Sequence, residues 1–166
     1  GLGDVYKRQV GYALEILGSY FKYPVHSIIR LNSEALINQL NTNLPWKERA
    51  WGAGSWIDHY STGVYHNHKH HNFPRGIETL VGWLHENINK ATGLWGDVTP
   101  EQQWLQQVNG LYRLTRGVHA QFGVNLPLPE TTIDTILNHA RQYGYFFENQ
   151  VNACNVLDII HPLWLC

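Results

Sequence analysis

Three short aromatic stretches decide the fold: RAWGAG at 49–54, TGLWGD at 92–97 and YGYFFE at 143–148. Trp51-Gly52 and Trp95-Gly96 stand 44 residues apart, and Phe146-Phe147 takes their place 51 residues after Trp95. Each stretch separates an apolar segment of helical periodicity from a more polar segment. A self-similar period of this length is typical of stacked helical hairpins. The sequence therefore predicts repeated pairs of helices joined at aromatic turns.

A second repeat supports this interpretation. Gly18 is followed six residues later by Pro24, and Gly123 is followed six residues later by Pro129. Glycine just past a helix and proline shortly after it are both signals of a helix end. Between these helix-end signals the apolar residues recur with helical spacing, and no segment shows the alternation of apolar and polar residues that a strand would have. We expect an all-α chain with helices over 10–18, 33–43, 55–70, 77–89, 100–122 and 131–142, and from about 150 onward.

The two ends of the chain differ from its middle. Residues 1–9, GLGDVYKRQ, look like translated adapter sequence from a metagenomic reading frame, and we expect them to stand outside the fold. The chain contains no methionine and ends in an apolar run, HPLWLC, that lacks a capping signal. We therefore expect residues 10–166 to form a single domain that is truncated at both ends.

Composition excludes several classes of function. The chain is 43% hydrophobic and 15% charged, which is typical of a globular protein rather than a disordered one. A net charge of −1 predicts no nucleic-acid partner, and the apolar runs are too short to span a membrane. Cys154 and Cys166 make no disulfide framework, no cofactor is implied, and no targeting segment indicates a compartment.

The stretch TLVGWLHENINKATGLWGD at 79–97 resembles the terpenoid cyclase and protein prenyltransferase superfamily, and within it bacterial prenyltransferase-like proteins. The resemblance implies an α/α toroid whose inner helices line a central pocket for a small molecule. About three hairpins are present where a complete toroid has about six, so the missing repeats of the same chain are expected partners. The Asp-x-Asp-Asp acid motif and the zinc-binding Asp-x-Cys pair of the superfamily are absent, so neither activity is carried over.

The last predicted helix holds the first set of candidate site residues. Asn155, Asp158 and His161 follow one another at i, i+3 and i+6, on about one helical face. Asp158 and His161 are candidate catalytic residues because a carboxyl group beside an imidazole can form an acid/base pair, and Asn155 is a candidate substrate-binding residue. In the alternative interpretation these side chains bind neighbouring helices and determine only the packing.

A second set lies on the helix predicted at 100–122. Asn109, Arg113 and Arg116 share a face at i, i+4 and i+7, and charges on a buried helix need partners. The two arginines either pair with Asp58 or Asp158, or bind an anionic group of a substrate such as phosphate or carboxylate.

A third set follows the first aromatic turn. Trp56 and Asp58, together with Tyr112, would place aromatic rings and a carboxylate at one rim, an arrangement that suits sugar stacking and hydrogen bonding. Asp58 is here a candidate catalytic residue, and Trp56 and Tyr112 are candidate substrate-binding residues. An ordinary polar end of a helical barrel would look the same.

Two metal sites are open as hypotheses, and neither has an assigned metal. Cys154, Asp158 and His161 stand at i, i+4 and i+7, and His66 and His70 stand at i and i+4. The alternative for the histidine pair is a solvated helix C-terminus, where the helix dipole favours imidazolium.

Three classes of function remain open. The first is an enzyme acting on a small hydrophobic or sugar-like substrate in the central pocket. The second is a non-catalytic helical-repeat scaffold or ligand-binding module, and the third is a carbohydrate-active enzyme on an unrelated (α/α)6 barrel. Polar inner residues that face a shared cavity would favour the first class, and enclosed, paired ones the second.

Overall fold

The computed structural model describes residues 4–142 and 152–166, and within these ranges the chain is all-α and contains no strand. The third aromatic stretch, YGYFFE, lies outside the described residues. Two isolated bridges, Asn89 with Leu94 and Thr99 with Gln103, are confined to turns. The elements are α1 (Asp4–Ile16), α2 (His26–Ile29), α3 (Ser33–Asn38), η1 (Gln39–Asn43), α4 (Ala50–His71), α5 (Glu78–Asn87), α6 (Leu105–Leu114), η2 (Thr115–Ala120), α7 (Pro129–Gln142) and α8 (Ala153–Leu165).

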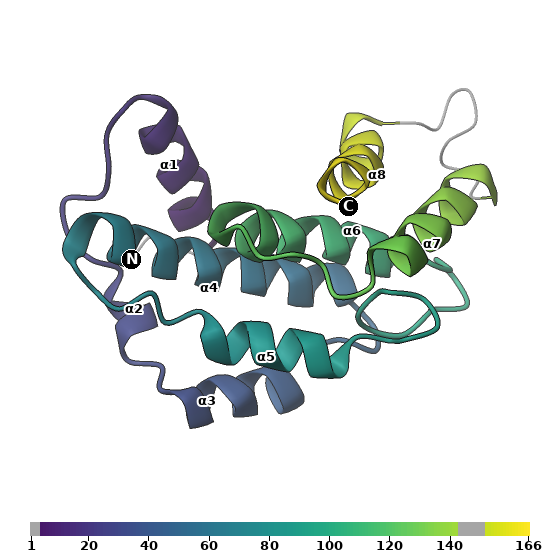
Figure 1. Ribbon diagram of the computed structural model, residues 1–166, viewed down its shortest axis with the longest axis horizontal. Helices are drawn as coiled ribbons and strands as arrows, with labels where there is room; N and C mark the ends of the chain where they lie inside the picture. Colours follow the sequence, from purple (N-terminus) through teal and green to yellow (C-terminus); the bar gives the residue numbers. More distant parts are fainter. Residues whose placement is uncertain (1–3, 143–151) are drawn as a thin grey trace.

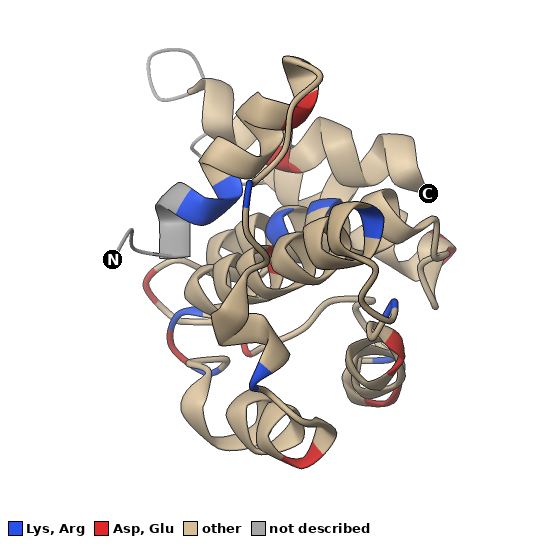
Figure 2. Ribbon diagram, turned by 90° about the vertical axis from the view of Figure 1, so that its left-hand side faces the viewer, with Lys and Arg blue, Asp and Glu red and all other residues tan. Residues whose placement is uncertain are grey.

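The helices form layers around a central pair (Figure 1). α4 packs along the continuous helix made by α6 and the π-helical turn η2. α5 and α3 pack together and cover one side of the pair, whereas α1 contacts α4 and α8 contacts α6 on the opposite side. α8 lies across α6 rather than alongside it, as the two perpendicular views show (Figures 1 and 2). The contacts therefore follow the chain in the order α1, α4, α6, α8.

The core fills the space between the central pair and the covering helices. It is built from leucine and isoleucine side chains that are almost fully buried, among them Leu36, Ile57, Leu84, Leu111 and Ile136. Burying a side chain of this size stabilises the fold by roughly 1.5–3 kcal/mol, so these contacts orient the helices.

Two glycines let the central helices come unusually close. A Cβ atom on Gly54 of α4 would lie 2.2 Å from the carbonyl oxygen of Gly110 in α6. A Cβ atom on Gly110 would lie 2.5 Å from the carbonyl oxygen of Ala50. Both neighbours are backbone atoms that cannot turn aside, so this crossing requires the absence of side chains at the two positions.

The structure confirms the helices whose signals are local. α5 and α7 match the predicted ranges within two residues at each end, and α3 with η1 covers 33–43. Asn32, rather than Ser33, caps α3, and its side chain accepts a hydrogen bond of 2.8 Å from the Ala35 amide. Gly18 and Gly123 follow helix ends with φ of +68° and +63°, the left-handed conformation that favours glycine.

The two described aromatic turns are not equivalent. TGLWGD is a true turn, in which Gly93 and Gly96 have φ of +67° and +90°. Trp51 and Gly52 instead belong to the first turn of α4, which begins five residues earlier than predicted. α6 begins five residues later than predicted, because residues 97–104 form turns. The shared Trp-Gly pair thus marks two different local structures.

Residues 4–9 also differ from expectation. They form the first part of α1, and Arg8 is buried, whereas the sequence predicts that residues 1–9 stand outside the fold. Charged positions of both signs are scattered over the ribbon in Figure 2, in keeping with a net charge of −1. Among the described helices, none combines the length and hydrophobicity that crossing a membrane would require.

Candidate functional site

A buried ion pair joins α1, α4 and η2. The carboxylate of Asp58 is fully buried in α4, and its Oδ2 atom accepts a hydrogen bond of 3.0 Å from Nη1 of Arg8. Nη2 of Arg116 in η2 pairs with the same oxygen. The structure thus selects the pairing of Arg116 with Asp58 from the alternatives left open by the sequence. A carboxylate enclosed between two arginines is suited to positioning them rather than to exchanging protons with a substrate.

Aromatic rings complete the surroundings of Arg116. Its guanidinium carbon lies 5.1 Å from the ring centroids of Tyr12 and of Tyr112, and Nη1 donates a hydrogen bond of 3.1 Å to the Tyr112 hydroxyl. Burial, reinforced by the Asp58 carboxylate, raises the pKa of Tyr12 to about 12. Stacking on ring faces adds to the ion pair and holds the guanidinium in one orientation.

Asp158 in α8 is the second carboxyl group on this side of the molecule. It is 1% exposed, and burial raises its pKa from the ordinary 3.8 to about 7, although Arg113 and Arg116 oppose the shift. Neither of its oxygens has a hydrogen-bond partner in the described part of the chain. Near neutral pH the group is therefore partly protonated and can donate a proton or a hydrogen bond.

His161 follows Asp158 by three residues and faces the aromatic ring of Tyr112. The two ring centroids lie 5.2 Å apart in an edge-to-face arrangement, and the centroid of Trp164 lies 6.0 Å from His161. Burial, assisted by the charge of Arg116, lowers the pKa of His161, so its imidazole is neutral near pH 7. A neutral imidazole can accept a proton. α8 thus carries a proton donor and a proton acceptor one turn apart.

Within residues 4–142 and 152–166, several buried side-chain atoms without a hydrogen-bond partner belong to α6, η2 and α8, which contact one another. These atoms come from both sides of the contact. They are both carboxyl oxygens of Asp158, Nδ2 of Asn109, Nε of Arg113, Nε of Arg116 and Nδ1 of His161. Arg113 also lies over the Tyr112 ring, with 5.1 Å from its guanidinium carbon to the centroid. Buried polar groups in folded proteins are nearly always paired, so such a set of atoms marks a place for water or a ligand.

The remaining predicted residues lie outside this set. Asn155 is buried in the first turn of α8, where its backbone amide bonds to the capping side chain of Asn152. Trp56 stacks on Tyr60 at 5.4 Å between ring centroids and packs against the core. Trp56 is partly buried, and its contacts in this structure are packing contacts.

The metal hypotheses find no support in the geometry. Across residues 4–142 and 152–166, no three side chains of His, Cys, Asp or Glu come together to hold a metal ion. Cys154 is exposed while Asp158 is buried, so the trio with His161 does not share one environment. His66 is 1% exposed and lies against the ring of Phe21 and beside His70, with 5.1 Å and 5.7 Å between ring centroids.

The raised pKa of Asp158 predicts a distinct pH dependence of stability. From about pH 4 upward the unfolded chain ionises this group while the folded chain keeps it neutral, so folding becomes less favourable until about pH 7. The side chain introduced by Asp158→Asn cannot ionise. The free energy of unfolding of this variant should therefore rise relative to that of the wild type, by about 4 kcal/mol between pH 4 and pH 8. Urea unfolding at several pH values measures this difference.

Asp134→Asn serves as the control for this measurement, because Asp134 is exposed on α7. It should leave the pH dependence of unfolding as in the wild type. A stability difference between Asp158→Asn and the wild type that does not change with pH would contradict an ionisation shift at Asp158.

Sequence reasoning missed two members of this region. Arg8 lies in the segment set aside as adapter sequence, and Tyr12 has no partner close to it in the chain. The spacing of Arg8, Tyr12 and Glu15 on one face of a helix is the only local signal, and it does not indicate which helix that face meets.

Comparison with known proteins adds no family: no family model, no curated protein and no solved structure matches this chain.

Proposed function

We propose that the face between α6–η2 and α8 binds a small molecule with an anionic group. The observation that carries this proposal is, among the described residues, the set of unpaired buried donors on α6 and η2, from Asn109, Arg113 and Arg116, together with the unpaired Asp158 on the adjoining α8. Arginine and amide N–H groups suit phosphate or carboxylate oxygens, and a protonated Asp158 would donate one further hydrogen bond.

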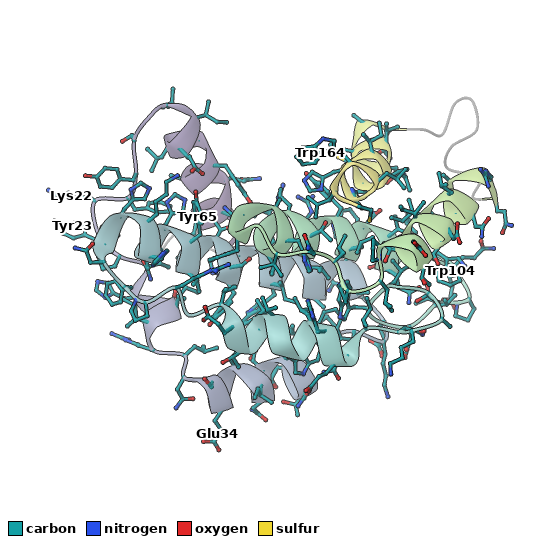
Figure 3. The ribbon with its side chains drawn as sticks, in the orientation of Figure 1. Lys22, Tyr23, Glu34, Tyr65, Trp104 and Trp164 are labelled. Atoms are coloured by element: carbon teal, nitrogen blue, oxygen red, sulfur yellow. The ribbon has the colours of Figure 1, made fainter. Side chains whose placement is uncertain are left out.

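The same groups support an enzyme that transfers protons. Asp158 would act as the general acid and His161 as the general base, because burial raises the pKa of Asp158 to about 7 and lowers the pKa of His161, which keeps the imidazole uncharged. Trp164 is 76% exposed and projects from the side of α8 that faces α1 in Figure 3, at the edge of this region. Asp58 takes no direct part and positions Arg116.

The architectural proposal is that the chain is part of an α/α toroid of the terpenoid cyclase and prenyltransferase type. Its support is the succession of contacts from α1 to α4, α6 and α8, with α3, α5 and α7 outside them. The crossing of α8 over α6 is the feature in which this arrangement differs from a regular arc of parallel inner helices (Figure 2).

A scaffold is the second candidate function, and the Asp58 ion pair favours it. Arg8, Asp58 and Arg116 tie three helices together through contacts inside the protein. On this proposal the polar residues of α6 and α8 also hold helices together, and the protein binds no small molecule at this face.

Calorimetric titration with inorganic pyrophosphate separates the two functions. Ligand binding predicts saturable heat that Arg113→Ala weakens at least about tenfold, because one charge-assisted contact contributes about 1.4 kcal/mol or more. Arg30→Ala, which removes an exposed arginine of the α2–α3 loop, is the matched control and should bind like the wild type.

A second readout tests the role of Asp158. Binding should be tighter at about pH 6 than at about pH 8, since only the protonated carboxyl group donates to an anion, and Asp158→Asn should abolish this difference. No measurable binding, together with a loss of stability in Arg113→Ala, would reject the ligand site in favour of the scaffold.

A further inference from the structure

Three hollows adjoin one another at the end of the molecule where α4 and α6 begin and α5 ends, on the right in Figure 1. Their volumes are about 540, 440 and 360 Å³. Glu48 lines the first and the third, and Arg49 and Gln106 line the second and the third. The three hollows are therefore direct neighbours, and together we call them the turn groove. Each of the three hollows has a volume within the range of small-molecule sites, which is about 300–1,000 Å³.

Tryptophan rings line the groove at both ends. Trp46 and Trp83 border the first hollow and stack on each other, with 5.5 Å between ring centroids, while Trp51 borders the second. The indole N–H groups of Trp46 and Trp83 are already bound inside the protein, to the Leu40 carbonyl and to Oδ1 of Asn41, each at 2.8 Å. These rings therefore offer apolar surface to a ligand rather than hydrogen bonds.

Side-chain amides supply the hydrogen-bonding groups between the rings. Asn41 accepts from Trp83 through Oδ1, which leaves its NH₂ group to donate. Asn87 donates to the Trp83 carbonyl oxygen at 2.9 Å, which leaves its Oδ1 atom to accept. A free donor and a free acceptor on two exposed side chains beside an aromatic ring match the hydroxyl groups of a sugar.

The charges of the groove indicate an uncharged ligand. The exposed carboxylates of Glu48, Asp97 and Glu101 stand beside the exposed cations Lys47 and Arg49 on the same surface. The excess of one negative charge is small, so the groove attracts neither anions nor cations strongly, while both kinds of group bind hydroxyls well. The length of the groove, its tryptophan rings and its mixed polar groups together point to a linear chain of neutral sugar units as the ligand. We propose that the turn groove binds an oligosaccharide.

This site is separate from the face between α6 and α8, and the two are tested independently. The chain is titrated by calorimetry with cellotetraose, maltotetraose and chitotetraose in turn, up to about 10 mM. At least one of the three should give saturable heat. Asn87→Ala should weaken that binding about tenfold through the loss of one acceptor, and Trp83→Phe should weaken it while keeping an aromatic ring in the core contact.

Asn138→Ala, an exposed asparagine of α7 remote from the groove, is the matched control and should bind like the wild type. Melting temperatures of all variants show whether weaker binding reflects unfolding. Glu48→Gln changes an exposed loop residue of the groove and leaves the core intact, so it tests the groove without affecting the fold. Absence of heat with all three tetrasaccharides would overturn the proposal. Binding that survives Asn87→Ala and Glu48→Gln but is lost in Arg113→Ala would overturn it as well, by placing the sugar at α6 and α8.

Discussion

Asp58→Ala is expected to lower the free energy of unfolding by about 3–5 kcal/mol, since removing one partner of a buried ion pair leaves uncompensated charge inside the protein. The carboxylate is fully buried, and it is the group that holds Arg8 and Arg116 together. Without it, two guanidinium groups face each other with no counter-charge. Urea unfolding followed by circular dichroism measures the loss.

Two comparisons isolate the charge effect. Asp134→Ala removes an exposed carboxylate of α7 and should change stability by less than about 0.5 kcal/mol. Arg8→Met and Arg116→Met introduced together with Asp58→Leu should recover much of the loss, because apolar groups of similar volume can replace all three members of a buried ion cluster. A single Asp58→Ala variant as stable as the wild type would show that the pair contributes nothing to the fold.

Gly54→Ala is expected to cost about 3 kcal/mol, near the upper end of overpacking effects. The added Cβ atom would lie 2.2 Å from a backbone oxygen of Gly110, so the central helices α4 and α6 would have to separate. Every core side chain between them would then lose contact. Gly110→Ala meets the Ala50 carbonyl oxygen at 2.5 Å and should behave in the same way.

Gly82→Ala provides the matched control on an exposed face of α5. No atom lies within 4 Å of its added Cβ, so only the helix propensity changes. Alanine should stabilise this helix by roughly 0.5–1 kcal/mol relative to glycine. The prediction is therefore a difference in sign between two identical substitutions, measured by thermal and urea unfolding. Equal effects at Gly54 and Gly82 would contradict the close crossing of α4 and α6.

Elements with local signals could be predicted from the sequence. The apolar spacing of Leu80 and Leu84, bounded by Gly76 and the turn at Gly93, is sufficient to predict α5. The glycine stops at Gly18 and Gly123 likewise depend only on neighbouring residues. The aromatic repeat was a less reliable guide. Trp51-Gly52 and Trp95-Gly96 look alike, yet one lies in a helix and the other in a turn.

The candidate site could be predicted only in part. Arg113 and Arg116 act electrostatically on Asp158, and the Tyr112 ring lies against His161, so α6 and η2 share polar contacts with α8. Asn109 is buried in α6, and its role stays a prediction. Asp58 is a candidate catalytic residue by sequence, and in the structure it pairs with Arg8 and Arg116. Trp56 is a candidate substrate-binding residue by sequence, and in the structure its ring is partly buried and stacks on Tyr60.

The sequence by itself determined the helical class, most helix positions and the polar faces, because hydrophobic spacing and glycine or proline signals act within a few residues. Only the tertiary structure decided which charges pair, which carboxyl group stays neutral and where the turn groove lies. Arg8 and Asp58 are 50 residues apart, and the pKa of Asp158 is set by burial under another helix. Such properties depend on distance and solvent exposure in the folded chain, which no local pattern specifies.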